Sequence, residues 1–176
     1  MANSVLDTMR KRRSIRRYDK QEIPKDSIQD ILQAAFFSPS SSNRRPWHFV
    51  LVTDQGKIEK LSRARDGSSQ FASGAPVVIV VCADTEIAGR WREDTSIAAI
   101  MMQLAATELG LGSCWIHIHD NIHSEEMSSE DYVRGVLGIP STVRVLCMIA
   151  MGFPAEEKSP HDDDEFMPER VHWEGF

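Results

Sequence analysis

The run of apolar residues from Pro76 to Ala83 constrains the fold more than any other feature of this 176-residue chain. Its members are mostly β-branched and do not alternate with polar residues, a pattern typical of a strand buried on both faces. Such a strand needs a layer of other elements on each side. The longest apolar runs, Ala75–Ala83 and Val145–Phe153, are each about half the ~20 residues that a membrane helix requires, so we expect no membrane span.

Amphipathic segments lie between the expected strands. In residues 26–37 the apolar positions follow the helical spacing i, i+3, i+4, i+7, i+8, occupied by Ile28, Ile31, Leu32, Ala35 and Phe36. Further helices are expected at 4–12, 55–64 and 129–137, and further strands at 47–53, 112–118 and 143–151. This order predicts an α/β or α+β fold with helices over the sheet, and the length suits a single domain, 1–176.

A long helix is expected to begin after a cap at Asp94 or Thr95 and to end near residue 110. Helical spacing then predicts that one apolar face packs inward, formed by Ile97, Ile100, Met101, Leu104 and Ala105.

Charge is distributed unevenly, although the formal net charge is only −6. Residues 1–20 carry seven Lys and Arg side chains against two Asp, whereas residues 154–176 carry eight acidic side chains against Lys158 and Arg170. A net negative chain is not expected to bind nucleic acid, and the compact basic stretch indicates a local site for a small anion. Three prolines in 154–176 predict an extended acidic arm that needs another surface to be ordered.

The three cysteines, Cys82, Cys114 and Cys147, each lie in an apolar run without a closely spaced partner. We interpret them as reduced core residues, which is typical of a cytoplasmic protein. The N-terminus shows no apolar stretch followed by a small-residue cleavage site, so no secretory signal is expected.

The basic segment, residues 12–18 (RRSIRRY), is the densest cluster of charge. Arginine forks match phosphate oxygens, and a serine hydroxyl can add a further hydrogen bond. In an extended stretch Arg12, Ser14 and Arg16 would share one side, which suits a small phosphorylated ligand. A solvated cluster, or one paired with the acidic arm, is an equally open interpretation.

The serine-rich loop, Ser38–Asn43, follows the helix expected at 26–37. Its small residues would let a flat ligand approach the backbone, and Asn43 offers both a donor and an acceptor to a planar heterocycle. A simple turn is the alternative interpretation. Three histidines, His117, His119 and His123, lie close together in the sequence, but nothing indicates that three ligands converge, so no metal site is predicted.

Taken together, these stretches resemble the FMN-dependent nitroreductase family. The matching segments appear in the family's order and cover residues 10–154: RRSIRRY (12–18), SPSSSN (38–43), PWHF (46–49), APVVIV (75–80), AATELGLGSCWI (105–116), LGIP (137–140) and MGFP (151–154). No single segment is specific, whereas the ordered set is.

The resemblance implies an α+β fold with a central mixed sheet covered by helices, and a homodimer that binds FMN at the subunit interface. It implies that one subunit holds the phosphate, the ribityl chain and the pyrimidine edge through Arg12, Arg13, Ser14 and Arg16. The residues implied to complete the site from the other subunit are Pro39, Ser40, Ser41 and Asn43. The stretch implied to pass the flavin ring near N5 is Trp115, Ile116 and His117, and a further side-chain contact is implied for Gln70.

By the same resemblance, the protein is an enzyme that transfers a hydride from NADH or NADPH to a nitroaromatic, quinone or similar conjugated acceptor in a ping-pong cycle. No side chain is assigned a catalytic role, because flavin N5 accepts and donates the hydride. Two alternatives stay open: a flavin-binding or regulatory module without turnover, and a phosphate-ligand protein without flavin. Family members often have a basic pair near the C-terminus for the phosphate, where this chain offers only Lys158 and His161.

Overall fold

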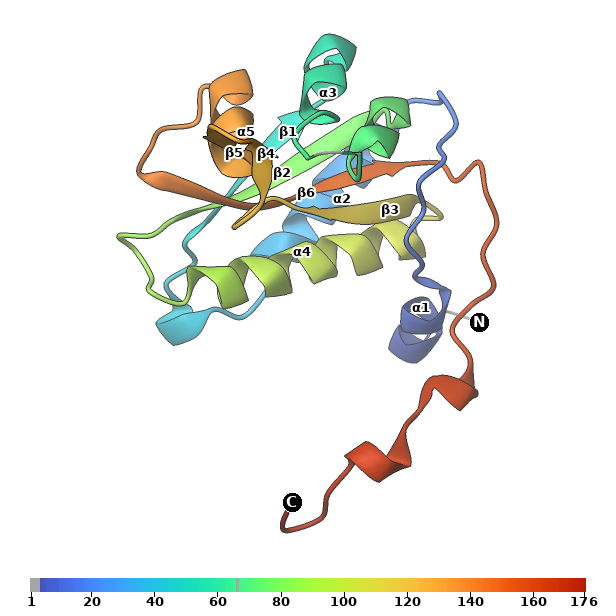
Figure 1. Ribbon diagram of the computed structural model, residues 1–176. Helices are drawn as coiled ribbons and strands as arrows, with labels where there is room; N and C mark the ends of the chain where they lie inside the picture. Colours follow the sequence, from blue (N-terminus) through green and yellow to red (C-terminus); the bar gives the residue numbers. More distant parts are fainter. Residues whose placement is uncertain (1–3, 66) are drawn as a thin grey trace.

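The computed structural model describes residues 4–65 and 67–176 and contains a four-stranded sheet in the order β1-β2-β6-β3 (Figure 1). The strands are β1 (Trp47–Val52), β2 (Val77–Asp84), β3 (Gly112–His117) and β6 (Val143–Gly152). Neighbouring strands pair antiparallel, and Ser14 adds a parallel bridge to Ser113 at the β3 edge, so the sheet is mixed as expected. The continuous apolar run forms β2, which is paired on both sides and is buried up to its last residue.

Helices cover both faces of this sheet (Figure 1). On one face lie α2 (Lys25–Phe36) and α4 (Trp91–Glu108); on the other lie α3 (Gln55–Leu61), α5 (Ser129–Leu137) and the 3-10 helix η2 (Gln70–Gly74). Successive residues of β2 serve the two layers in turn. Ile79 packs in the core with α2 and α4, whereas Val78 and Val80 pack in the core with α3 and α5. The α+β class is therefore confirmed.

Helix α4 begins at Trp91, ahead of the expected cap at Asp94 or Thr95, so the prediction of its start is wrong. The polar groups of these two residues are used differently. The Thr95 hydroxyl donates to the carbonyl of Trp91, one turn back, at 2.6 Å. The Asp94 carboxylate accepts from the backbone N–H of Ser41, outside the helix, at 2.8 Å.

The inward face of α4 also differs from the prediction. Ile97 and Ile100 are 36% and 39% exposed, while the buried apolar face consists of Trp91, Ala98, Ala99, Met102 and Ala106. Small alanine side chains let the helix lie close to the sheet. Because α4 is apolar on both faces, spacing alone does not show which face is covered.

The remaining elements are short. Helix α1 (Val5–Lys11) begins at a capping box between Ser4 and Asp7. A small hairpin of β4 (Ile122–Ser124) and β5 (Met127–Ser128) was not predicted. The other 3-10 helices are η1 (Ser41–Asn43), η3 (Asp163–Glu165) and η4 (Pro168–Arg170). Among the described residues, no helix is long and apolar enough to cross a membrane.

The two ends of the chain meet. The basic segment passes the edge of the sheet at Ser113 and then bridges from Tyr18 to Pro154. The acidic arm, residues 154–176, first runs back along this segment, and its last part extends away from the body of the molecule (Figure 1).

Candidate functional site

The basic segment is held in place by its apolar residues. Ile15 is buried, and its backbone N–H donates to the carbonyl of Ser113 at 3.0 Å. The Tyr18 hydroxyl lies 2.5 Å from the carbonyl oxygen of Ile15 and 3.1 Å from that of Ala150. Burial raises the pKa of Tyr18, so the hydroxyl keeps the proton that it donates. The arginines between these anchors therefore project from a fixed backbone.

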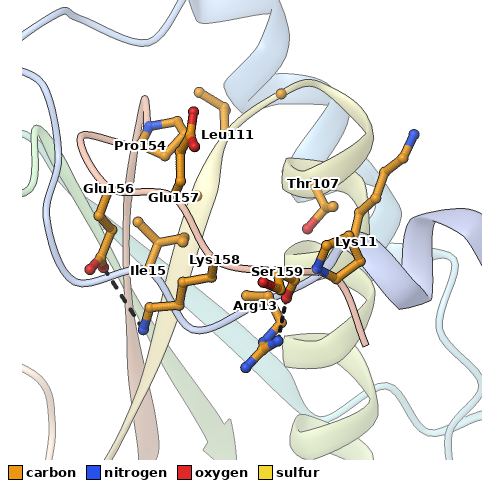
Figure 2. Close-up of a pocket in the computed structure, with 13 residues that line it drawn as sticks. Lys11, Arg13, Ile15, Thr107, Leu111, Pro154, Glu156, Glu157, Lys158 and Ser159 are labelled. Carbon is orange, nitrogen blue, oxygen red and sulfur yellow. Dashed lines mark hydrogen bonds and ion pairs between the residues drawn. The ribbon is translucent and has the colours of Figure 1, made fainter. Parts of the chain in front are cut away.

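Alternation along the segment separates its side chains. Arg13 and Ile15 line a cleft of about 550 Å³, together with Thr107 and Gly110 at the C-terminal end of α4 (Figure 2). Arg13 donates to the carbonyl of Ser159 on the far wall of this cleft. Arg12, Ser14 and Arg16 are predicted to share one side of the segment. None of the three lines this cleft, which lies on the side of Arg13 and Ile15.

The first part of the acidic arm packs on the basic segment. The Glu156 carboxylate accepts from the backbone N–H of Arg16 at 2.5 Å and of Arg17 at 3.2 Å, which lowers the pKa of Glu156. Lys158 Nζ donates to the Ser14 carbonyl at 2.7 Å and lies 4.0 Å from the Glu156 carboxylate (Figure 2).

Further along the arm, His161 Nε2 lies 3.3 Å from an Arg12 guanidinium nitrogen. Thus Lys158 and His161, the two residues expected near the C-terminus to serve the phosphate, both reach the segment predicted to bind it.

Gln70 lies near this segment as well. It is the exposed first residue of η2, and the next residue, Phe71, has its ring under the Arg16 guanidinium at 5.6 Å. The structure therefore places Gln70 on the element that contacts Arg16.

Trp115, Ile116 and His117 form the second half of β3, an edge strand. Ile116 is buried, whereas the half-buried Trp115 and His117 rings stack with centroids 6.1 Å apart. Because the Ser113 carbonyl faces outward to Ile15, alternation turns the backbone groups of Trp115 and His117 to the same outer edge. This edge offers N–H donors to a flat ligand.

The pKa of His117 is lowered from its usual value, mainly by burial and in part by the nearby Arg65 guanidinium. The lowered pKa favours the neutral imidazole.

The serine-rich loop lies at the opposite end of the molecule's long helix. The N–H of Ser41 contacts Asp94 in the first turn of α4, whereas the basic segment lies beside its C-terminal end. The 18 residues of α4 span about 27 Å. One chain therefore does not bring its two predicted half-sites together, the second of which comprises Pro39, Ser40, Ser41 and Asn43.

The three neighbouring histidines have different surroundings. His123 stacks on Tyr132 at 3.9 Å, while His119 is buried, and its two ring nitrogens each lie 3.3 Å from a guanidinium nitrogen, of Arg92 and of Arg144. In the described part of the chain, no group of three potential metal ligands converges.

The sequence did not indicate that two carboxylates, those of Glu130 and Asp94, are buried. Glu130 binds Arg144 through two hydrogen bonds, of 2.6 and 2.7 Å, and also accepts from the Val145 N–H at 2.9 Å. Asp94 is 2% exposed. A signal for Asp94 exists: it precedes Ala98 and Met102 at helical spacing, and these are core positions.

Comparison with known proteins matches nearly the whole chain. A sequence model described as the Nitroreductase family matches residues 9–65 and 57–153. A provisionally named NADH dehydrogenase/NAD(P)H nitroreductase of Archaeoglobus fulgidus is 38% identical over 168 residues, which cover 93% of each chain.

Solved structures agree with the sequence matches. An FMN-dependent nitroreductase of Clostridium difficile has a TM-score of 0.95 at 40% identity, covering 97% of this chain and 99% of that one. An NADPH:FMN oxidoreductase of Vibrio harveyi, complexed with NAD⁺, has a TM-score of 0.81 at 26% identity, covering 99% and 78%. The matched region includes the basic segment, the serine-rich loop and β3.

Proposed function

The chain belongs to the nitroreductase family and is an NAD(P)H-dependent FMN oxidoreductase, and we propose that it passes a hydride to nitroaromatic, quinone or similar conjugated acceptors in a ping-pong cycle. The observation that carries the proposal is the near-complete match to an FMN-dependent nitroreductase, joined to a fixed row of arginines beside an open strand edge. In such a cycle the nicotinamide leaves before the acceptor binds in the same place.

The residues present fit FMN. Arg12, Arg13, Ser14 and Arg16 offer the charge-assisted donors that a phosphate and the oxygen-rich edge of a flavin require. Lys158 and His161 lie close enough to this segment to support the phosphate end. The outer edge of β3 offers backbone donors at Trp115 and His117, and Gln70 precedes Phe71, the residue of η2 whose ring lies under Arg16. These residues would hold the cofactor.

Bound FMN supplies hydride transfer at its N5 atom, so the protein needs no nucleophile and no general acid or base of its own. The side chains position charge instead. Arg16 would lie at the pyrimidine edge, where its positive charge stabilises the negative charge that hydride uptake brings there. The β3 edge, with Ile116 buried behind it, would fix the plane of the ring.

A homodimer is part of the proposal. Completing the site requires a second copy, because the serine-rich loop meets α4 at Asp94 whereas the basic segment lies beside Thr107, about 20 Å further along the same helix. The uncovered face of α4 supports this arrangement: a groove between α1, α2 and α4 is lined by Val5, Met9, Met101 and Leu104, beside the exposed Ile97 and Ile100. Exposed apolar patches of this kind mark protein interfaces.

We also propose that residues 1–176 act as one FMN-binding domain. The proposal is supported by the acidic arm, late in the chain, which packs on the basic segment near its start. A cytoplasmic location belongs to the proposal as well, and it is supported by three cysteines that are free and buried.

The test begins with the absorption spectrum of the protein after incubation with FMN and desalting. We expect flavin bands that NADH or NADPH bleaches without oxygen and that a quinone or nitroaromatic restores. Stopped-flow reduction by each nicotinamide would identify the preferred one, and parallel double-reciprocal lines would support the ping-pong order. A protein that stays colourless contradicts the proposal.

The alternatives give different results. Retained FMN that neither nicotinamide bleaches would indicate a flavin-binding module without turnover. Unchanged flavin retention in a variant with both Arg12→Ala and Arg16→Ala would contradict the assignment of the basic segment to FMN.

A further inference from the structure

We propose that Asp94 positions the serine-rich loop for FMN binding without touching the cofactor. The inference rests on the function proposed above, in which this loop contacts FMN held by a second copy of the chain. Asp94 lies outside every stretch from which the cofactor site was predicted, and its role is visible only in the folded chain.

The loop and the residues after it adopt a backbone conformation that most side chains disfavour. Ser42, Asn43 and Arg45 have φ angles of 51°, 54° and 49°, in the left-handed region, which Asn tolerates better than Ser or Arg. Hydrogen bonds within the loop hold part of this shape: the N–H groups of Asn43 and Arg45 donate to the carbonyl and the hydroxyl of Ser40, both at 3.0 Å. Such strain persists only where the surrounding structure fixes it.

Asp94 supplies a fixed point outside the loop. Its Oδ1 accepts the backbone N–H of Ser41 at 2.8 Å, at the residue directly before the strained stretch. Asp94 belongs to an 18-residue helix that packs on the sheet, and the residue is 2% exposed. The bond therefore ties the loop to the rigid core rather than to another mobile segment.

Polar atoms of the loop's first residue, of Asp94 and of the first β1 residue lack a hydrogen-bond partner. Among the described residues, Ser38 Oγ, Asp94 Oδ2 and Trp47 Nε1 are buried without one. Buried unsatisfied groups are rare and costly in native proteins, so each of them calls for an explanation. Burying a partly unsatisfied carboxylate lowers stability. If Asp94 sets the shape of the loop, that role explains why a carboxylate is present at this position.

A purely structural role for Asp94 is the competing explanation. An acidic side chain in the first turn of a helix interacts favourably with the helix dipole, whatever else it contacts. Glu93 has the same charge in the same turn, is exposed, and so provides a matched control.

The experiment compares Asp94→Ala, Asp94→Asn and Glu93→Ala in the full-length chain. FMN dissociation constants come from the quenching of FMN fluorescence, and hydrogen exchange of the FMN-free protein reports the loop. We expect Asp94→Ala to raise the FMN Kd about tenfold, as expected for losing a hydrogen bond to a charged group. Exchange should accelerate in the peptide containing Ser41 but not in β2.

Asp94→Asn keeps an oxygen that can accept the Ser41 N–H, so its Kd should remain within about threefold of the wild-type value. Glu93→Ala should leave both measurements unchanged. If Asp94→Ala does not fold, Asp94→Ser replaces it, because its hydroxyl is one atom too short to reach Ser41 and should give the same rise in Kd.

Wild-type Kd and exchange in Asp94→Ala would overturn this inference while leaving the proposed function intact. So would an equal effect of Glu93→Ala, which would assign the loss to the helix dipole. A wild-type chain that binds no FMN would instead overturn the proposed function, and this inference with it.

Discussion

Arg16 differs from the other arginines of the basic segment in what surrounds its guanidinium. Arg12 and Arg13 contact the acidic arm, at His161 and at the Ser159 carbonyl, whereas Arg16 lies over the Phe71 ring. Arg16 is also exposed, so its side chain contributes little to the core. Its function can therefore be tested separately from folding.

Replacing Arg16 with Ala should weaken FMN binding about ten- to a hundredfold, the amount expected for losing a charged hydrogen-bond donor. It should also make the flavin reduction potential more negative, because the positive charge that favours reduction is gone. Titration with FMN and a potentiometric titration measure the two effects. Arg17→Ala is the control, since Arg17 is the exposed neighbour and its contacts with the arm are through the backbone. Equal effects of the two variants would contradict the specific role of Arg16.

Glu130 illustrates a residue that stabilises the fold near the site. Burial alone would raise its pKa, but the hydrogen bonds from Arg144 and from the Val145 N–H, together with the charge of Arg144, hold the pKa below its usual value. The bonded carboxylate links the start of α5 to β6, and His119, just beyond β3, lies against the same Arg144.

Glu130→Gln should lower the free energy of unfolding by about 3 kcal/mol, the lower end for a broken buried ion pair, because the Arg144 side chain keeps 37% of its exposure. Since the folded pKa is lowered, the stabilisation is complete above the unfolded pKa of 4.5 and is lost as the pH falls through the folded pKa. Urea unfolding from pH 7 to pH 3 measures the difference between the two proteins. The difference should shrink in acid, whereas exposed Glu126→Gln should show no difference at either pH. A gap between wild type and Glu130→Gln that is constant with pH would contradict this account.

At the scale of elements, the contact between β3 and the basic segment depends on a glycine. A Cβ at Gly112 would lie 2.7 Å from Ile15 Cγ2 and 2.8 Å from Ile15 Cβ, closer than real atoms approach. Ile15 is buried and its backbone is bonded to Ser113, so it has little room to yield. Only glycine lets the segment lie flat against the strand edge.

Gly112→Ala should therefore push the basic segment off β3, lowering stability by about 1–3 kcal/mol and weakening FMN binding as well. The control is Gly135→Ala in α5, where an added Cβ meets nothing within 4 Å, so the change should be neutral or stabilising. Thermal unfolding and FMN titration separate the two effects. Unchanged FMN affinity in a destabilised Gly112→Ala would show that the segment's position is not set by this contact.

The sequence predicts an element well when its residue pattern fits only one position in the fold. β2 has no polar face, so only the centre of a covered sheet suits it. α4 is apolar on both faces, and spacing could not show that Ala98 faces the sheet while Ile97 does not. The β4–β5 hairpin is too short to carry a periodic signal.

The sequence pointed to candidate site residues, whose role in FMN binding stays a prediction, but it did not show how they are arranged. Arginine clusters and serine-rich turns are visible in the sequence, and the family resemblance assigned them to one cofactor. The residues that hold these segments in place could not be predicted. Asp94 contacts Ser41 across 53 residues of sequence, and Glu156 contacts Arg16 across 140. Contacts of that range depend on the completed fold.

At the scale of the whole molecule, the uneven charge acts within the chain. The first half of the acidic arm lies on the basic segment and on α1. The Glu156 carboxylate accepts from the Arg16 N–H, and the His161 N–H donates to the carbonyl of Arg10 in α1. The exposed ion pair between Arg10 and Asp163 adds little energy by itself. The arm thus contacts the side chains of Arg12 and Arg13 and places Lys158 at the Ser14 carbonyl.

The two half-sites of one chain lie at opposite ends of α4, so each complete site should combine the basic segment of one subunit with the serine-rich loop of the other. This can be tested with two variants that damage different halves. Arg16→Ala removes a donor from the basic segment. Asn43→Gly removes the loop side chain and tolerates the φ of 54° without strain. Each homodimer carries its lesion in both sites and should bind FMN weakly.

A heterodimer of the two variants, purified through two different affinity tags, separates the possibilities. If the half-sites combine between subunits, one site contains both lesions and the other contains neither. The heterodimer should then bind one FMN per two chains with the wild-type Kd, and isothermal titration would measure both quantities. If each chain instead built its site alone, every site would carry one lesion, and the heterodimer would bind FMN as weakly as the two homodimers. That result would contradict the shared site, because both half-sites would then have to meet within one chain although α4 separates them.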